Sequence, residues 1–135
     1  MPSTQFLTVN LRALGFDAVC EWEFEELPSG LYRIVEIPFG ALDPLDIDLQ
    51  YGDVVELAPS SDGMHELRSI RERGGWRRFD FVLSRDYVGS QEMEQWLSRV
   101  EAAGGSWIRE AGGAVTIVLP PDSNWDPQDL GESPI

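Results

Sequence analysis

Hydrophobic and polar residues alternate in steps of two over most of this chain, and the period becomes that of a helix only once. The clearest alternation places Cys20, Trp22 and Phe24 on one side and three glutamates on the other. Period two with aromatic residues on one side is typical of a half-buried antiparallel strand. Further strands are expected at 6–14, 31–37, 54–57, 65–71, 76–83, 107–110 and 114–119. The chain is therefore expected to consist mainly of strands.

The single helical segment follows the sixth of these strands. Four apolar residues recur there at i, i+3, i+4 and i+7, namely Met93, Trp96, Leu97 and Val100. They would form one stripe that packs on a sheet. Ser90 suits the N-cap, and Gly104-Gly105 suits the end of the helix. The predicted fold class is α+β, with a mainly antiparallel sheet or small barrel-like N-terminal part followed by a strand-helix-strand-strand unit.

The length of 135 residues fits one domain over 1–135, with 122–135 as a poorly structured acidic tail. No apolar run approaches the ~20 residues of a membrane span, and the N-terminus lacks the pattern of a signal peptide. We therefore expect a cytoplasmic protein without a membrane partner. With one cysteine and one histidine, an internal disulfide and a cysteine-rich zinc site are excluded.

The net charge of −14 is the strongest compositional signal. All ten basic residues are arginine, and residues 1–67 hold thirteen acids against two arginines. Such a field repels nucleic acid and anionic lipid, and it speeds the encounter with a basic partner. The alternative is that the acids serve solubility alone.

Half of the arginines lie in one segment, between Arg68 and Arg78, where they are mixed with acids. Two interpretations stay open for them. They pair with acidic segments on neighbouring strands, which would set the strand register, or they bind an anion together with Arg33.

Candidates for catalysis are few. Cys20 and His65 are the only thiol and imidazole, and we expect a small core residue and a surface residue, respectively. Two carboxylate pairs, Glu23 with Glu25 and Asp46 with Asp48, would lie about 7 Å apart on a strand, which is also the spacing of any solvated strand face. The segment containing Asp43 lacks the glycine and terminal glutamate of a calcium-binding EF-hand. We therefore predict no catalytic residue, no metal and no cofactor.

The segment from Leu31 to Leu57 resembles the small bacterial family known as domain of unknown function 4265. The matching residues form a first block of Gly30, Tyr32, Arg33, Ile37, Pro38 and Phe39, and a second of Tyr51, Gly52, Asp53, Val54 and Val55. A third block usually has Ser-Gly-His at its turn, where this chain has Arg73-Gly74-Gly75, so a role that rests on that histidine is absent. The resemblance covers about residues 20–121. It implies no established activity.

We expect a protein-binding module rather than an enzyme. Its leading form is a bacterial immunity protein that occludes the basic site of a cognate toxin. Trp125, an aromatic residue among acids, is either an anchor for this partner or a cap that folds back on the sheet. The expected partner-binding residues are Glu23, Glu25, Asp43, Asp46, Asp48, Tyr51, Asp53 and Trp125. The alternatives are a small-ligand-binding or enzymatic domain with an arginine-lined cleft, and an accessory subunit of a larger assembly.

Overall fold

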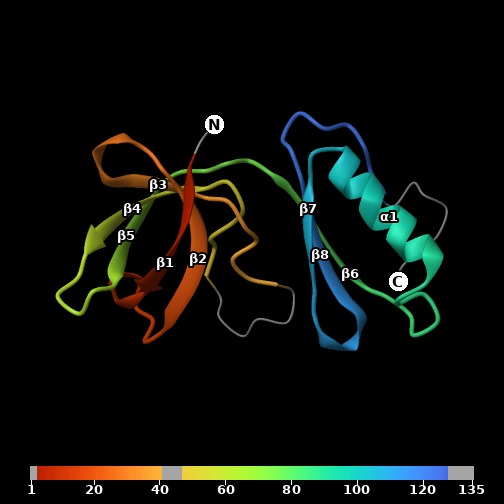
Figure 1. Ribbon diagram of the computed structural model, residues 1–135, viewed down its shortest axis with the longest axis horizontal. Helices are drawn as coiled ribbons and strands as arrows, with labels where there is room; N and C mark the ends of the chain where they lie inside the picture. Colours follow the sequence, from red (N-terminus) through yellow and green to blue (C-terminus); the bar gives the residue numbers. More distant parts are fainter. Residues whose placement is uncertain (1–2, 41–46, 128–135) are drawn as a thin grey trace. The chain divides into compact units, whose positions relative to one another are not determined.

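The computed structural model describes residues 3–40 and 47–127 (Figure 1). Within them the chain forms two compact units. The first consists of the described residues up to Pro38 and of Asp48–Gly75; the second consists of Phe39, Gly40, Ile47 and the described residues from Trp76 onward. This division into compact units does not test whether the chain is the single domain expected from the sequence, which stays a prediction.

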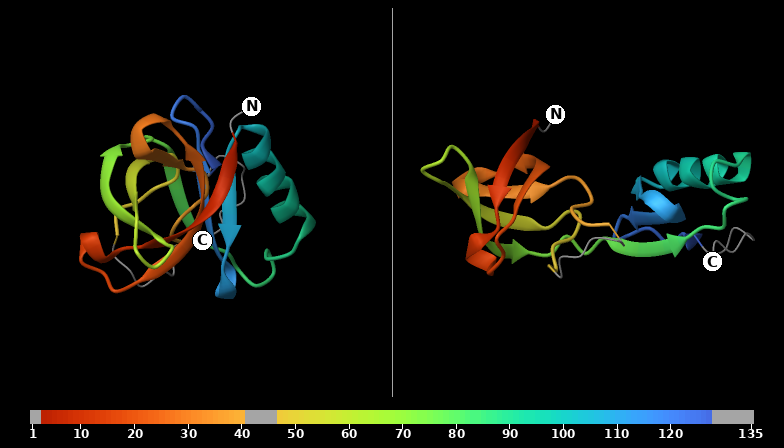
Figure 2. Two further views of the ribbon diagram at one scale, coloured as in Figure 1. Left: turned by 60° about the vertical axis from the view of Figure 1, so that its left-hand side comes forward. Right: turned by 90° about the horizontal axis from the view of Figure 1, so that it is seen from below.

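The first unit is a closed barrel of five strands in the order β1-β2-β3-β4-β5 (Figures 1 and 2). The strands are β1 (Thr4–Asn10), β2 (Val19–Glu26), β3 (Leu31–Ile34), β4 (Val54–Pro59) and β5 (His65–Glu72), with short 3-10 helices at Arg12–Leu14 and Pro28–Gly30. Neighbours pair antiparallel except β1 and β5, which close the barrel with two parallel pairs, Val9 with His65 and Asn10 with Glu66. The barrel encloses fully buried apolar side chains that include Val9, Phe24, Ile34, Val55 and Leu67.

The second unit is a three-stranded antiparallel sheet with one helix on one of its faces (Figure 2). Its elements are β6 (Arg77–Val82), α1 (Gln91–Ala102), β7 (Ser106–Arg109), a 3-10 helix at Ala111–Gly113 and β8 (Ala114–Leu119). The sheet order is β6-β8-β7, so β6 and β7 run parallel on either side of β8. The predicted stripe of α1 is buried against the sheet, and Trp96 packs edge-on against Phe81 with ring centroids 5.2 Å apart.

The predicted α+β class is therefore confirmed, with a barrel in the N-terminal part and a strand-helix-strand-strand unit after it. Two boundaries differ from the prediction. The first strand ends at Asn10 instead of continuing to Leu14, because the chain turns there into a 3-10 helix. The third ends at Ile34, because the ladder with β2 is broken after it: Val35 N still donates to Glu23 O, but Glu23 N donates to the side chain of Glu36 instead of to a backbone carbonyl.

The first part of the expected C-terminal tail, up to residue 127, makes hydrogen bonds with the second unit. The guanidinium of Arg77 donates to the carbonyl oxygens of Ser123 and Trp125, each at 2.8 Å. The indole of Trp96 donates to the carbonyl of Pro127 at 3.2 Å. Residues 128–135 lie outside the described part of the chain.

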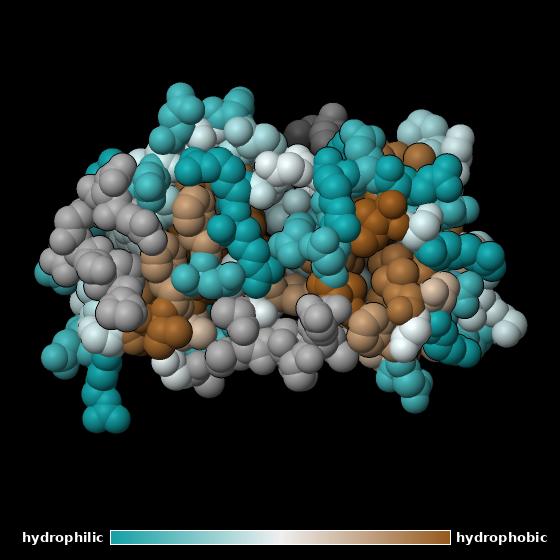
Figure 3. Space-filling model, turned by 180° about the vertical axis from the view of Figure 1, so that it is seen from behind, coloured by the Kyte–Doolittle hydropathy of each residue, from teal (hydrophilic) through white to brown (hydrophobic). Residues whose placement is uncertain are grey.

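Hydrophobic surface reaches solvent in separate patches between hydrophilic side chains on the face shown in Figure 3. Among the described residues, three large apolar side chains are more than half exposed, namely Phe6 (64%), Val19 (55%) and Val82 (59%). Two of them belong to strands of the barrel. Phe6 is the most exposed of the three.

Candidate functional site

The outer face of β2 carries a row of carboxylates, as the alternation predicts. Trp22 and Phe24 are buried in the barrel, whereas Glu21 is exposed and Glu23 and Glu25 are partly exposed. Residues two apart on a strand share one face, so these three glutamates lie side by side along β2. Cys20, which was expected in the core beside Trp22, is only half-buried.

The hairpin partner of β2 brings a fourth carboxylate to this row. After β3 ends, Val35 N donates to Glu23 O. The next residue, Glu36, turns its carboxylate to accept a hydrogen bond from Glu23 N. Thr4 donates its hydroxyl to the Glu23 carboxylate at 2.6 Å. We call Glu21, Glu23, Glu25 and Glu36 the acidic face.

Ion pairs leave most of the acidic face unneutralised. Arg33 binds the carboxylate of Glu25 at 2.8 Å. Among the described residues, none of the ion pairs includes Glu21, Glu23 or Glu36. Three carboxylates therefore share this surface without an arginine between them.

The crowding of these carboxylates is visible in two pKa shifts. Burial raises the pKa of Glu36, the hydrogen bond from Glu23 N opposes this shift, and repulsion from Glu23 and Glu21 adds to it. The pKa of Tyr51 is raised as well, first by burial and then by the negative charge of Glu23. Of the expected partner-binding residues, Tyr51 is thus one whose pKa responds to the charge of the acidic face.

Glu36 was missed by the sequence analysis. It follows a strand that was expected to continue to Ile37, where alternation alone would not distinguish it from any solvated side chain. The register of the hairpin, continued past Ile34, would place Glu36 opposite Trp22, on the buried side of β2. The contact with Glu23 N arises because the regular ladder stops after Ile34, which the alternation of the sequence does not indicate.

Asp53, which was expected to bind a partner, is buried in the first unit. It is 1% exposed. Its carboxylate accepts hydrogen bonds from Gln50 N at 3.0 Å, from Gly74 N at 2.9 Å and from the guanidinium of Arg73 at 2.9 Å. A Cβ atom on Gly74 would clash with the backbone of Gly52, so the two glycines let the chain approach closely enough for these bonds. Asp53 therefore joins the start of β4 to the end of β5.

The other expected partner-binding residues have different positions. Asp48 is exposed and shares Arg73 with Asp53. Asp43 and Asp46 lie outside the described residues. Trp125 is partly buried against the core of the second unit, with its ring 5.6 Å from the guanidinium of Arg99, which agrees with the alternative that it folds back.

The arginine cluster is engaged with acids and carbonyl groups. Arg71 pairs with Glu56 across β4 and β5 at 3.2 Å, and Arg73 pairs with Asp53 and Asp48. Arg68 pairs with Glu66, Arg78 with Asp80, and Arg77 binds the carbonyl groups described above. Of the two interpretations of this cluster, these contacts favour the structural one.

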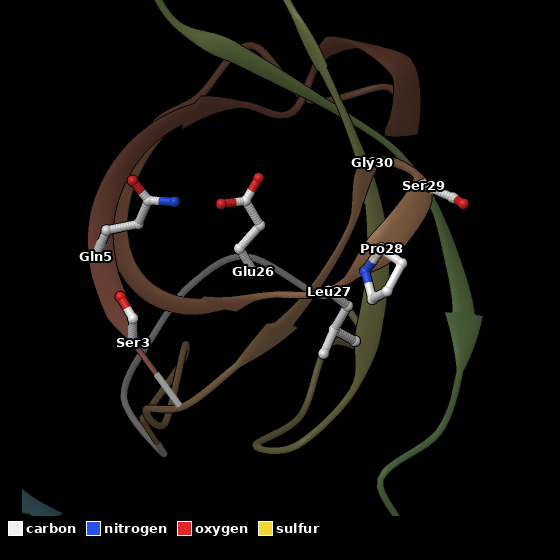
Figure 4. Close-up of a pocket in the computed structure, with 7 residues that line it drawn as sticks. All are labelled: Ser3, Gln5, Glu26, Leu27, Pro28, Ser29 and Gly30. Atoms are coloured by element: carbon white, nitrogen blue, oxygen red, sulfur yellow. The ribbon is translucent and has the colours of Figure 1, made fainter. Parts of the chain in front are cut away.

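An open pocket of about 610 Å³ lies at one end of the barrel (Figure 4). Gln5 and Glu26 point into it, and Ser3 and the segment Leu27–Gly30 complete its lining. No arginine lines this pocket, so it does not correspond to the expected arginine-lined cleft. Its one ionisable group is a carboxylate.

The thiol and the imidazole lie on opposite sides of β1. Val9 pairs with Cys20 on β2 and with His65 on β5. Two strand spacings separate Cys20 from His65, about 10 Å between their Cα atoms. In the described part of the chain, no group of three or more His, Cys, Asp or Glu side chains could hold a metal ion. No helix among the described residues is long and apolar enough to cross a membrane.

Comparisons with known proteins add little to this geometry. No family model matches the chain, and no significant match was found among curated proteins. A crystal structure of a hypothetical protein from Neisseria gonorrhoeae is similar, with a TM-score of 0.49 and 19% sequence identity. The similarity covers 93% of this chain and 80% of that chain.

Proposed function

We propose that this chain is a protein-binding module whose acidic face captures a basic partner, and that it acts as an immunity protein against a bacterial toxin. The observation that carries the proposal is the row of Glu21, Glu23 and Glu36, which no described ion pair neutralises. Burial, and after it repulsion from Glu23 and Glu21, raises the pKa of Glu36, so the charged form of this carboxylate destabilises the fold. A cationic partner would relieve this repulsion.

A toxin that acts on nucleic acid or nucleotides is a suitable partner because its active site carries positive charge. An acidic protein that covers such a site competes with the substrate for the same charges, and its field also raises the rate of encounter. The net charge of −14 supports the same interpretation. Membership of the family named above also stays a proposal.

Charge reversal on the acidic face tests the proposal. The variant Glu21→Lys with Glu23→Lys leaves the ion pair of Glu25 with Arg33 intact. The control variant, Glu101→Lys with Asp122→Lys, changes the net charge equally at exposed positions of the second unit. The partner is the product of the adjacent gene, or a protein captured by the wild-type chain from the producing organism.

We expect the reversal on β2 to slow association roughly tenfold at low salt, and the control to slow it less. The wild-type rate should fall as salt shortens the screening length from ~10 Å at 0.1 M to ~3 Å at 1 M. When each variant is co-expressed with the toxin, the wild type should protect growth best, the control variant less, and the reversal on β2 least. A partner that binds equally at low and high salt, and equally to both variants, would contradict electrostatic capture.

A further inference from the structure

In the part of the chain that the structure describes, one edge of β1 has a neighbouring strand only at its C-terminal end. Its pairing with β5 involves only Val9 and Asn10, so in the described chain residues Thr4 to Leu7 have a partner strand on the β2 side alone. The N-terminal end of β1 extends past the neighbouring strands of the barrel (Figure 2, right). Among the described residues, β5 therefore closes the barrel along the C-terminal end of β1 and leaves the N-terminal end of this edge open.

The register shows which backbone groups face this open edge. The Glu23 carbonyl accepts from Val35 N, and Glu23 N donates to Glu36, so the backbone groups of Glu23 point away from β1. Phe6 is the residue opposite Glu23. In an antiparallel ladder, two such residues form a non-hydrogen-bonded pair. The N–H and C=O of Phe6, and by alternation those of Thr4, therefore point to the open edge.

The side chains near this edge do not protect it. Natural edge strands are usually shielded by lysine, proline, a bulge or a covering segment. The strand TQFLTVN has neither lysine nor proline, and Phe6 presents an apolar ring that is 64% exposed. An apolar side chain next to unpaired backbone groups is a ready template for a further strand.

The outer face next to this edge is acidic. Thr4 lies opposite Glu25, Phe6 opposite Glu23, and Thr8 opposite Glu21. A strand added to β1 would lie about 10 Å, or two strand spacings, from β2. Arginine or lysine at every second position of that strand could reach over β1 to the glutamates, and an arginine would pass over the ring of Phe6.

We propose that the open edge of β1 is a docking strand that binds an extended, basic segment of the partner by strand addition, with Phe6 as its apolar contact. This inference rests on the proposed function and specifies the element of the partner that the acidic face binds. A second copy of this chain suits the edge less well, because pairing through its own β1 would add threonine and phenylalanine side chains and no positive charge beside the acidic face. Its own glutamates would lie three strand spacings, about 14 Å, from the first row, so the charge of the acidic face would stay uncompensated.

The probe is a short synthetic peptide that alternates arginine with threonine, compared with one that alternates glutamate with threonine. Hydrogen exchange is measured at the individual amides of β1 in the full chain. The basic peptide should slow exchange at Thr4 and Phe6 at least several-fold. Exchange at Gln5 and Leu7, whose amides already face β2, should change little, and the acidic peptide should have no effect.

Two substitutions at one position separate the backbone from the ring. Phe6→Ala removes the ring and keeps the N–H, whereas Phe6→Pro also removes an N–H that the barrel does not use. Proline is tolerated on edge strands, and urea unfolding confirms that each variant is folded. The alanine variant should bind the basic peptide more weakly than the wild type, and the proline variant should lose protection at Thr4 altogether.

The outcomes distinguish this inference from the proposed function. If the basic peptide binds in a salt-dependent way but leaves Thr4 and Phe6 exchanging freely, the docking strand is wrong and electrostatic capture stands. If both peptides bind equally or neither binds, both the inference and its electrostatic basis are wrong. Protection of Phe6 that rises with protein concentration alone would identify a second copy as the occupant and overturn our choice of partner.

Discussion

At the scale of residues, the same side-chain type has opposite roles according to its backbone contacts. Asp53 accepts three hydrogen bonds in the interior of the first unit, whereas Asp48, which contacts the same arginine, is exposed. A buried carboxylate left without partners costs more than any surface pair contributes. Asp53 is therefore part of the structure of the barrel.

This difference predicts the stability of two matched variants. Asp53→Asn should lower the free energy of unfolding by about 1–3 kcal/mol, because an amide cannot replace all three acceptor interactions. Asp48→Asn removes the other carboxylate that pairs with Arg73, and it should change the free energy of unfolding by less than about 1 kcal/mol. Urea denaturation of both variants measures the difference. Equal losses of unfolding free energy would show that the buried carboxylate of Asp53 contributes no more to stability than the exposed carboxylate of Asp48.

Glu36 predicts a pH dependence of stability. Since burial and the neighbouring glutamates raise its pKa in the folded state, the folded protein binds this proton more tightly than the unfolded chain. Its contribution to stability therefore increases as pH falls from neutral through the raised pKa, and levels off near the ordinary value of about 4.

The variant Glu36→Gln retains an oxygen that can accept from Glu23 N, and it removes the charge. We expect it to be more stable than the wild type at pH 7 and to lose this advantage at low pH. The control Glu101→Gln, at an exposed position of α1, should show no such trend. Urea denaturation at several pH values measures both. A Glu36→Gln variant that is less stable at pH 7 would contradict the repulsion described for the acidic face.

At the scale of elements, the ends of α1 follow local rules. The Ser90 hydroxyl accepts from Met93 N at 3.1 Å, and Glu92 and Glu94 lie in the first turn, where the helix dipole favours acids. The residue at which a strand ends depends more on its neighbouring strands than on its own sequence. β3 stops at Ile34 because Glu23 N donates to the Glu36 side chain instead of to the backbone of this segment, although the alternation continues to Ile37.

Removal of the cap should destabilise the second unit. Ser90→Ala should cost about 1 kcal/mol of unfolding free energy, because it leaves the Met93 amide without its acceptor. Ser90→Asp keeps an acceptor at the same position and should retain most of the stability. Thermal unfolding followed by the circular dichroism of the helix compares the two. If both variants lose the same stability, the hydroxyl is not acting as a cap.

At the scale of the whole molecule, charge is distributed by the pairing of strands and not by sequence alone. Arg71 and Arg77 are placed next to a carboxylate and a carbonyl group that lie far from them in sequence, Glu56 and Ser123. Arg73 likewise meets distant acids, whereas Arg68 and Arg78 pair with acids two residues away. The acidic face receives only Arg33 among the described ion pairs. Basic residues thus neutralise other parts of each unit and leave this row negative.

The sequence by itself determined the order of strands and helix, the buried stripe of α1 and the inward position of Trp22 and Phe24. These features depend on the period of side chains along one element, which is local information. Only the tertiary structure decided that Asp53 is buried, that Glu36 joins Glu23, and that Thr4 and Phe6 face an open edge. Each of these depends on the register between strands and on where the barrel closes, and a shift of one residue would reverse which side chains and backbone groups meet.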